Sequence, residues 1–294
     1  MFTTYCRRPL VLFLASFVCA LVPSIASADH SWGPYHWART SNPFTLQLGD
    51  NVSPAWDSYL AITSTDWSVS GVLDTTIVAG GAGNPRRCQA TSGRVEVCNA
   101  MYGNNGWLGL AQIWISSDHI VQGTTKLNDT YFNTAKYNTP AWRNLVMCQE
   151  VGHTLGLDHQ DENFSNTPLG TCMDYSNDPN PNRHPNAHDY EELGIIYAHL
   201  DSTSTLSQTS ARSALPPFTA ANRTSPHPAH SQTSAQGALP PAMTDIDLET
   251  PAQWGRLIKT AHGGRSAVYE LGFGGGHKIF TFVVWAEGEE RGRR

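Results

Sequence analysis

The sequence is poor in charged residues, and positive charge is the scarcer kind. The 294 residues include 19 lysines and arginines against 25 aspartates and glutamates, which gives a formal net charge of -6. Such a chain lacks the concentrated basic surface with which proteins bind nucleic acid or anionic lipid. We therefore expect no nucleic acid among its partners.

The sequence also lacks a hydrophobic run of the roughly 20 residues that a membrane-spanning helix needs. Its apolar stretch at residues 10–22 follows Arg7 and Arg8 and precedes the small residues Ala26-Ser27-Ala28. This order predicts a secretory signal peptide over residues 1–28. Its removal deletes two arginines and no acids, so the charge of -6 becomes -8. We expect a secreted, extracellular or periplasmic protein with no membrane attachment after cleavage.

Cysteine is scarce as well, and two of the six cysteines lie in the predicted signal peptide. The remaining four are Cys88, Cys98, Cys148 and Cys172. An even number in an exported protein favours two disulfides, for which three connectivities exist. Of these we favour Cys88 with Cys98 and Cys148 with Cys172.

Composition divides the rest of the chain into three parts. Residues 29–200 carry nearly all the mixed apolar patterning and are long enough for one domain with a core. Residues 201–244 contain 29 Ser, Thr, Pro or Ala among 44, which predicts a disordered linker. Residues 245–294 regain apolar alternation around three glycines, which predicts a small β-hairpin region that docks against another surface.

Local patterns within residues 29–200 predict an α+β fold. Alternating apolar residues predict strands at 44–48, 73–78, 107–115 and 120–128, with a strand pair between Cys88 and Cys98. Cap signals predict helices over 53–65, from Thr139 and from Asn186.

The residues best suited to chemistry lie within 148–159, whose sequence is CQEVGHTLGLDH. On a helix, Gln149 and His153 lie one turn apart on one face, and Glu150 lies on the neighbouring stripe. Gly156 can adopt a left-handed turn that ends the helix and directs His159 back toward His153. The pattern therefore predicts a zinc site with a general base beside it.

The spacing resembles the long motif of the metzincin metallopeptidases, H-E-x-x-H-x-x-G-x-x-H. Four positions match it, and Gln149 occupies the place of the first histidine. The sequence Cys172-Met173-Asp174-Tyr175 stands where metzincins have their Met-turn. The resemblance covers roughly residues 108–197, and it implies a twisted mixed sheet with an active-site helix and a C-terminal helix.

By this resemblance the protein is a secreted zinc-dependent metalloendopeptidase acting on a protein or peptide substrate. His153 and His159 would bind Zn²⁺, with Gln149 as a weaker, neutral ligand. Glu150 would be the general base for a metal-activated water, and Tyr175 would bind the metal or stabilise the oxyanion. The substrate would add as a strand to the sheet edge near residues 108–115.

The glutamine leaves three alternatives open. Gln149 coordinates through its amide oxygen, another group completes the site, or the site holds no metal. The candidate replacements are Tyr175, Asp158, His184 and His188, although a histidine in a polar loop is ordinarily solvated. His119, between two predicted strands, is assigned no role. Without metal the chain would be a non-catalytic pseudo-peptidase that serves as a secreted binding or adhesion protein.

Overall fold

The computed structural model describes residue 1 and residues 30–207, 239–244 and 246–289. The predicted signal peptide and most of the predicted linker lie outside these residues. In the described part of the chain, no helix is long and apolar enough to cross a bilayer.

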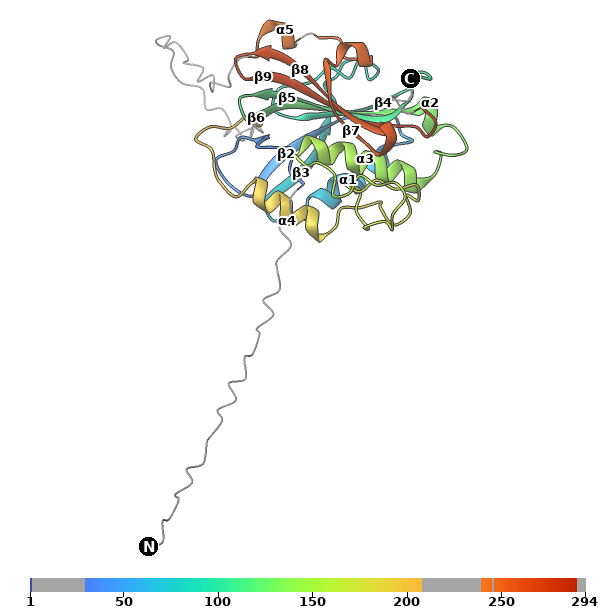
Figure 1. Cartoon of the computed structure of the whole chain (residues 1–294). Coiled ribbons are helices and arrows are strands. Elements are labelled where there is room, and N and C mark those ends of the chain that lie inside the picture. Colours follow the sequence, from blue (N-terminus) through green and yellow to red (C-terminus); the bar gives the residue numbers. More distant parts are fainter. Residues whose placement is uncertain (2–29, 208–238, 245, 290–294) are drawn as a thin grey trace, which may run out of the picture.

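A 9-stranded mixed sheet forms the centre of the fold, with the strand order β3-β2-β4-β6-β5-β9-β8-β7 and with β1 beside β6 (Figure 1). The pairs among β1, β2, β3, β4 and β6 are parallel, and those that involve β5, β7, β8 and β9 are antiparallel. The predicted mixture of helices and a mixed sheet is confirmed. The strands are β1 His36–Trp37, β2 Phe44–Asn51, β3 Leu73–Ala79, β4 Val95–Ala100, β5 Trp107–Ser116, β6 His119–Asn128, β7 Arg256–Ala261, β8 Ser266–Gly274 and β9 His277–Trp285.

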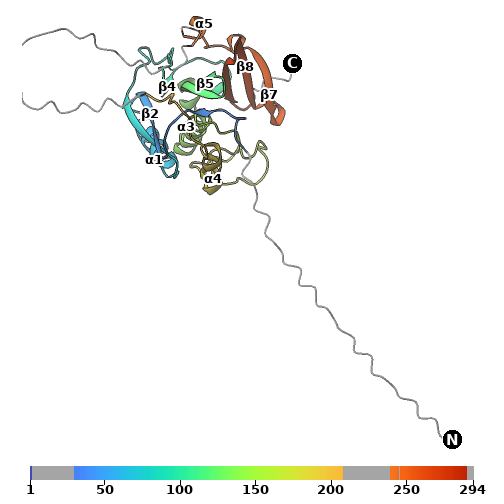
Figure 2. The ribbon, with the colours of Figure 1, turned by 90° about the vertical axis from the view of Figure 1, so that its left-hand side faces the viewer.

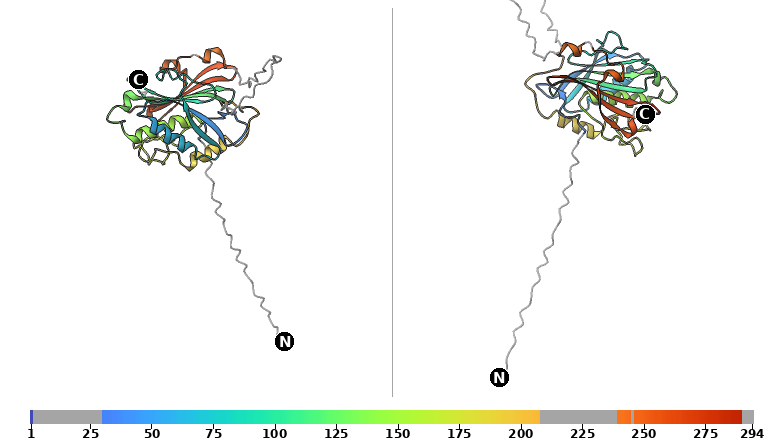
Figure 3. Two further views of the ribbon diagram at one scale, coloured as in Figure 1. Left: turned by 180° about the vertical axis from the view of Figure 1, so that it is seen from behind. Right: turned by 45° about the horizontal axis from the view of Figure 1, so that its top comes forward.

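The larger helices cover one face of this sheet, and a short helix lies over the other, as the view from behind also shows (Figure 3). The first set is α1 Asp57–Trp67, α3 Pro140–Thr154 and α4 Ala187–Ile196, and the short helix is α5 Pro241–Thr244. Helix α2 Asp129–Phe132 follows β6, and two 3₁₀ turns, Pro251–Gln253 and His262–Gly264, flank β7. Each face of the sheet therefore has its own hydrophobic core.

Helix α3 begins and ends where its sequence predicts. The Thr139 side chain accepts a hydrogen bond from the Trp142 amide, and Pro140 occupies the first turn. After Thr154 the chain turns at Gly156, whose φ of 95° is left-handed. A β-carbon at this glycine would also lie 2.5 Å from the Tyr35 carbonyl oxygen, so both space and backbone conformation require glycine here.

Two predicted elements differ from the structure. Helix α1 begins at Asp57 rather than at residue 53, and Ile62 is 36% exposed because the buried face passes through Leu60, Thr63 and Trp67. The segment between Cys88 and Cys98 holds one strand, β4, instead of a strand pair. Its first half contains a turn in which the Arg94 amide donates to Thr91 O at 3.4 Å. Both favoured disulfides, Cys88–Cys98 and Cys148–Cys172, are present.

The C-terminal strands are part of the main sheet. The predicted hairpin of β8 and β9 is confirmed, and β9 pairs with β5 through residues such as Ala111 and Phe282. Figure 2 shows β8 and β7 on the side of β5 away from β2. Strand β5 therefore has neighbours on both sides, β6 and β9, so the free edge expected near residues 108–115 does not exist. Residues 201–207 also pack on the body, because the Thr205 amide donates to Ala38 O at 2.9 Å.

Candidate metal centre

The last turn of α3 and the bend after it bring the two predicted histidine ligands together. The ring centroids of His153 and His159 are 4.5 Å apart, and the ring planes cross at 76°. Both side chains are buried, as are Gln149 and Glu150, which are 0% and 1% exposed. The predicted approach of His159 to His153 through the turn at Gly156 is therefore present.

Hydrogen bonds fix the orientation of both imidazole rings. His153 Nδ1 lies 2.9 Å from Leu157 O, and since a carbonyl only accepts, Nδ1 carries the proton and Nε2 keeps its lone pair. His159 Nδ1 lies 3.3 Å from Asp158 Oδ1, while its Nε2 is buried without a hydrogen-bond partner. A second hydrogen bond from the other ring nitrogen is typical of histidines that bind metals.

The environment also keeps His153 neutral. Burial, followed by the neighbouring His159, lowers the pKa of His153 to about 3. For Asp158, burial alone would raise the pKa, but hydrogen bonds and charges from His159 and Lys259 hold it well below its ordinary value. His153 is therefore a neutral imidazole, the form that can bind a metal. Asp158 is an ionised carboxylate, the form that can orient His159.

Gln149 is held by the turn that contains Tyr175. Its amide nitrogen donates to Cys172 O at 2.9 Å, and its Oε1 is buried without a partner. Cys172 is itself tied by a disulfide to Cys148, the residue before Gln149. This arrangement leaves the amide oxygen, the atom that can bind a cation, as the unused group.

Glu150 lies between α3 and the sheet. A β-carbon on Gly109 of β5 would lie 2.5 Å from Val146 Cγ1 and 3.1 Å from Glu150 Oε1, so glycine here allows α3 to pack closely on the sheet. Glu150 Oε2 is buried without a hydrogen bond, and burial raises the pKa of Glu150 well above its ordinary value. Among the described residues, Glu150 and the two imidazoles do not form a group with all ligand atoms within 4.8 Å. The carboxyl group thus lies beside the histidine pair and not among its ligands.

The turn at residues 172–175 completes the floor of the site. The Tyr175 ring lies 4.0 Å from the His159 ring, centroid to centroid. Burial raises the pKa of Tyr175 well above its ordinary value, against a hydrogen bond with the Ser266 side chain of β8. Met173 packs beneath α3, where a β-carbon at Gly152 would lie 2.5 Å from its sulfur.

Two of the other candidate ligands, His184 and His188, lie away from the site. His184 is at the surface, with Nδ1 2.7 Å from Asp66 Oδ2. The His188 ring stacks on His30 at 4.9 Å. Asp158 contacts His159 and also receives Lys259 Nζ at 2.6 Å. Of the four, Asp158 orients a predicted ligand, and Tyr175 contacts one.

The C-terminal strands close the site. The Phe282 ring of β9 is stacked on His153, with centroids 4.5 Å apart and planes within 9°. Lys259 of β7 bridges Asp158 and Glu162 at 2.6 and 2.7 Å. Because β9 also occupies the side of β5, an extended peptide has no strand edge to join next to the two histidines.

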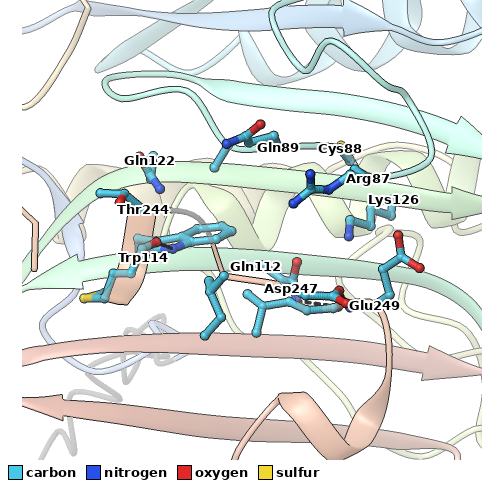
Figure 4. Close-up of a pocket in the computed structure, with 14 residues that line it drawn as sticks. Arg87, Cys88, Gln89, Gln112, Trp114, Gln122, Lys126, Thr244, Asp247 and Glu249 are labelled. Atoms are coloured by element: carbon cyan, nitrogen blue, oxygen red, sulfur yellow. Dashed lines mark hydrogen bonds between the residues drawn. The ribbon is translucent and has the colours of Figure 1, made fainter. Parts of the chain in front are cut away.

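A second polar pocket lies on the opposite face of the sheet, beneath the segment that contains α5 (Figure 4). Lys126 and Arg87 face Asp247 and Glu249 across it. Burial lowers the pKa of Lys126 to about 8, although the acidic groups oppose this. No local pattern predicted this pocket, because its residues come from three distant segments.

A comparison of the chain with models of protein families finds no match, and a comparison with curated proteins finds none either. The functional interpretation therefore rests on the geometry of the buried histidine site.

Proposed function

We propose that the protein is a secreted zinc-dependent metallopeptidase whose site is closed by its own C-terminal strands. One observation carries the proposal. Three polar atoms at the site, Gln149 Oε1, Glu150 Oε2 and His159 Nε2, are buried with no hydrogen-bond partner. Unpaired buried polar atoms cost free energy, and a cation with its water ligands would satisfy them.

The residues fit a zinc ion. His153 and His159 would hold it through their Nε2 atoms, and Gln149 would contribute its amide oxygen. Zinc bound there supplies a Lewis acid that polarises a scissile carbonyl and acidifies water. Burial raises the pKa of Glu150, and a cation bound nearby would oppose this and favour the ionised carboxylate. The carboxylate would then accept the proton of the attacking water and return it to the leaving amine.

The remaining side chains position these groups. Asp158 holds His159 through Nδ1, and the Leu157 carbonyl holds His153 in the same way. Tyr175 lies against His159, where its hydroxyl can donate to the oxyanion once β8 has moved and released it from Ser266. Cleavage therefore requires displacement of the C-terminal strands, which exposes the edge of β5 for a substrate strand.

The closed site and Gln149 also favour a second function from a different class. The sheet has no free edge at the histidine pair, and Gln149 provides a neutral amide where a third imidazole would stand. Both features suit a non-catalytic protein that binds partners through its outer surface. The absence of zinc would follow from that function, and the absence of cleavage would accompany it.

The two functions are separated by measuring zinc content and cleavage of a casein substrate by the full chain. Glu150→Gln keeps the size of the side chain and removes the base, so the peptidase proposal predicts loss of cleavage with zinc retained. Glu192→Gln is the matched control, because Glu192 also lies on a helix, is buried and has an Oε2 that accepts no hydrogen bond. Equal cleavage by wild type and Glu150→Gln, or a protein without zinc, would overturn the proposal.

A further inference from the structure

A second histidine cluster lies away from the site described above, where three distant segments meet. His36 belongs to β1, His119 begins β6, and Asp201 lies beyond the end of α4. Their side chains are 7%, 33% and 10% exposed, so the cluster is largely buried but within reach of solvent. A surface depression lined by His36 and His199 opens beside it.

The ligand atoms of this cluster converge. Asp201 Oδ1 lies 3.4 Å from His36 Nε2 and 3.2 Å from His119 Nε2, and all three atoms lie within 4.8 Å of one another. His199 Nε2 is 3.1 Å from His36 Nε2 and 3.7 Å from Asp201 Oδ1. Ligands about 2.0–2.1 Å from a tetrahedral zinc ion lie about 3.4 Å from one another. The four separations of 3.1, 3.2, 3.4 and 3.7 Å lie close to that spacing.

Hydrogen bonds outside the cluster orient its members. His36 Nδ1 lies 2.7 Å from Pro34 O, which can only accept, so Nδ1 donates this hydrogen bond and Nε2 is turned toward the cluster. Asp201 Oδ2 accepts from Arg39 Nη1 at 2.9 Å and from the Arg39 amide at 3.1 Å. The other carboxylate oxygen, Oδ1, is therefore turned toward the imidazoles.

His36 Nε2 therefore faces both Asp201 Oδ1, at 3.4 Å, and His199 Nε2, at 3.1 Å. A proton or a cation between these atoms would satisfy them. In metal sites, the ring nitrogen of a histidine that does not bind the metal often donates a hydrogen bond to a carbonyl. The carboxylate ligands of such sites are likewise hydrogen-bonded, as Asp201 is here by Arg39.

We propose that His36, His119 and Asp201 bind a divalent transition-metal ion, of which zinc best suits a set of imidazole nitrogens and one carboxylate oxygen. His199, the most exposed member, takes the fourth position. The ion joins the segment before β2, the start of β6 and the segment after α4. This site is structural and does not depend on the proposed peptidase function.

The first test measures zinc in the full chain after EDTA treatment and zinc addition. Removing the half-buried His119 in His119→Ala should lower the zinc content by about one equivalent, as expected for one tetrahedral site. The matched control is His184→Ala, which removes a histidine paired with a carboxylate at the surface. It should keep the wild-type content, whether that is one ion or two. Equal zinc content in wild type and His119→Ala would overturn the proposal.

A spectroscopic test does not depend on the stability of the alanine variant. In His119→Cys, Co²⁺ added to the metal-free protein should produce a thiolate-to-cobalt charge-transfer band, because position 119 would then provide a thiolate ligand. His184→Cys should give no such band. A folded His119→Cys protein, judged by its circular dichroism, that takes up cobalt without this band would exclude position 119 as a ligand.

The two zinc proposals fail separately. If only the structural site exists, wild type holds one ion, which His119→Ala loses, and no peptide is cleaved. If only the site at His153 and His159 exists, His119→Ala keeps its zinc and its cleavage. A protein with no bound zinc after addition contradicts both.

Discussion

Phe282 covers His153 face to face, with ring centroids 4.5 Å apart and planes within 9° of parallel. The two residues are 129 positions apart, and Phe282 reaches the histidine because β9 pairs with β5. The same contact covers one face of the imidazole, and His153 is 1% exposed. In the proposed peptidase, β9 would occupy the side of β5 to which a substrate strand would add.

Shortening Phe282 should open the site. In Phe282→Ala the stacked ring is lost, and we expect faster peptide cleavage by the full chain together with a stability loss of about 3–5 kcal/mol. Cleavage rates measured at equal folded fractions test this expectation.

Phe280→Ala is the control for that variant. Phe280 lies on the same strand and is equally buried, but its ring contacts Trp32 and Tyr35. It should lose comparable stability with a smaller gain in cleavage. Equal gains in both variants would indicate general loosening and would exclude a specific closure over His153.

The Cys148–Cys172 disulfide should support zinc binding as well as stability. It closes a loop with a sequence separation of 24, and replacing both cysteines by alanine should cost about 3–4 kcal/mol on loop entropy. The turn that holds the Gln149 amide through Cys172 O would also loosen, so zinc affinity should fall. The control is the alanine pair at Cys88 and Cys98, which should lose stability but keep its zinc affinity.

Lys126 should give the protein a distinctive pH dependence. Burial lowers its pKa from 10.5 to about 8, so between these values the unfolded chain binds more protons than the folded one, and stability rises with pH. The rise should reach on the order of 3 kcal/mol in wild type relative to Lys126→Met. Urea unfolding between pH 8 and 10 measures it. Lys136→Met, at an exposed ion pair, should follow wild type.

Local signals in the sequence predicted the backbone structure around the two histidines. The cap at Thr139, the left-handed Gly156 and both disulfides follow from residues a few positions apart, where backbone preference and chain geometry decide the structure. The apolar pattern likewise gave β5, β6 and the final hairpin. These features depend on interactions and backbone preferences of residues that are close together in the sequence.

The closure of the site was not predicted, because the residues of a strand do not identify the distant strand with which it pairs. Residues 107–115 are buried on both faces of the sheet. Both edge strands and central strands can be buried in this way, so the apolar pattern did not show that β5 has a neighbour on each side. The pairing of β5 with β9 joins segments separated by residues 208–238. His119 was assigned no role for the same reason, since its partners His36 and Asp201 lie about eighty positions away on either side.

The zinc affinity of Gln149→His tests the central proposal most directly. The competition titration is carried out with a chelator in the His119→Ala background, so that the second cluster does not contribute. An imidazole in place of the amide should tighten zinc binding roughly 10- to 100-fold over Gln149, because it restores a stronger ligand beside His153 and His159. The same weak binding, or none, in both proteins would contradict a metal centre at this position.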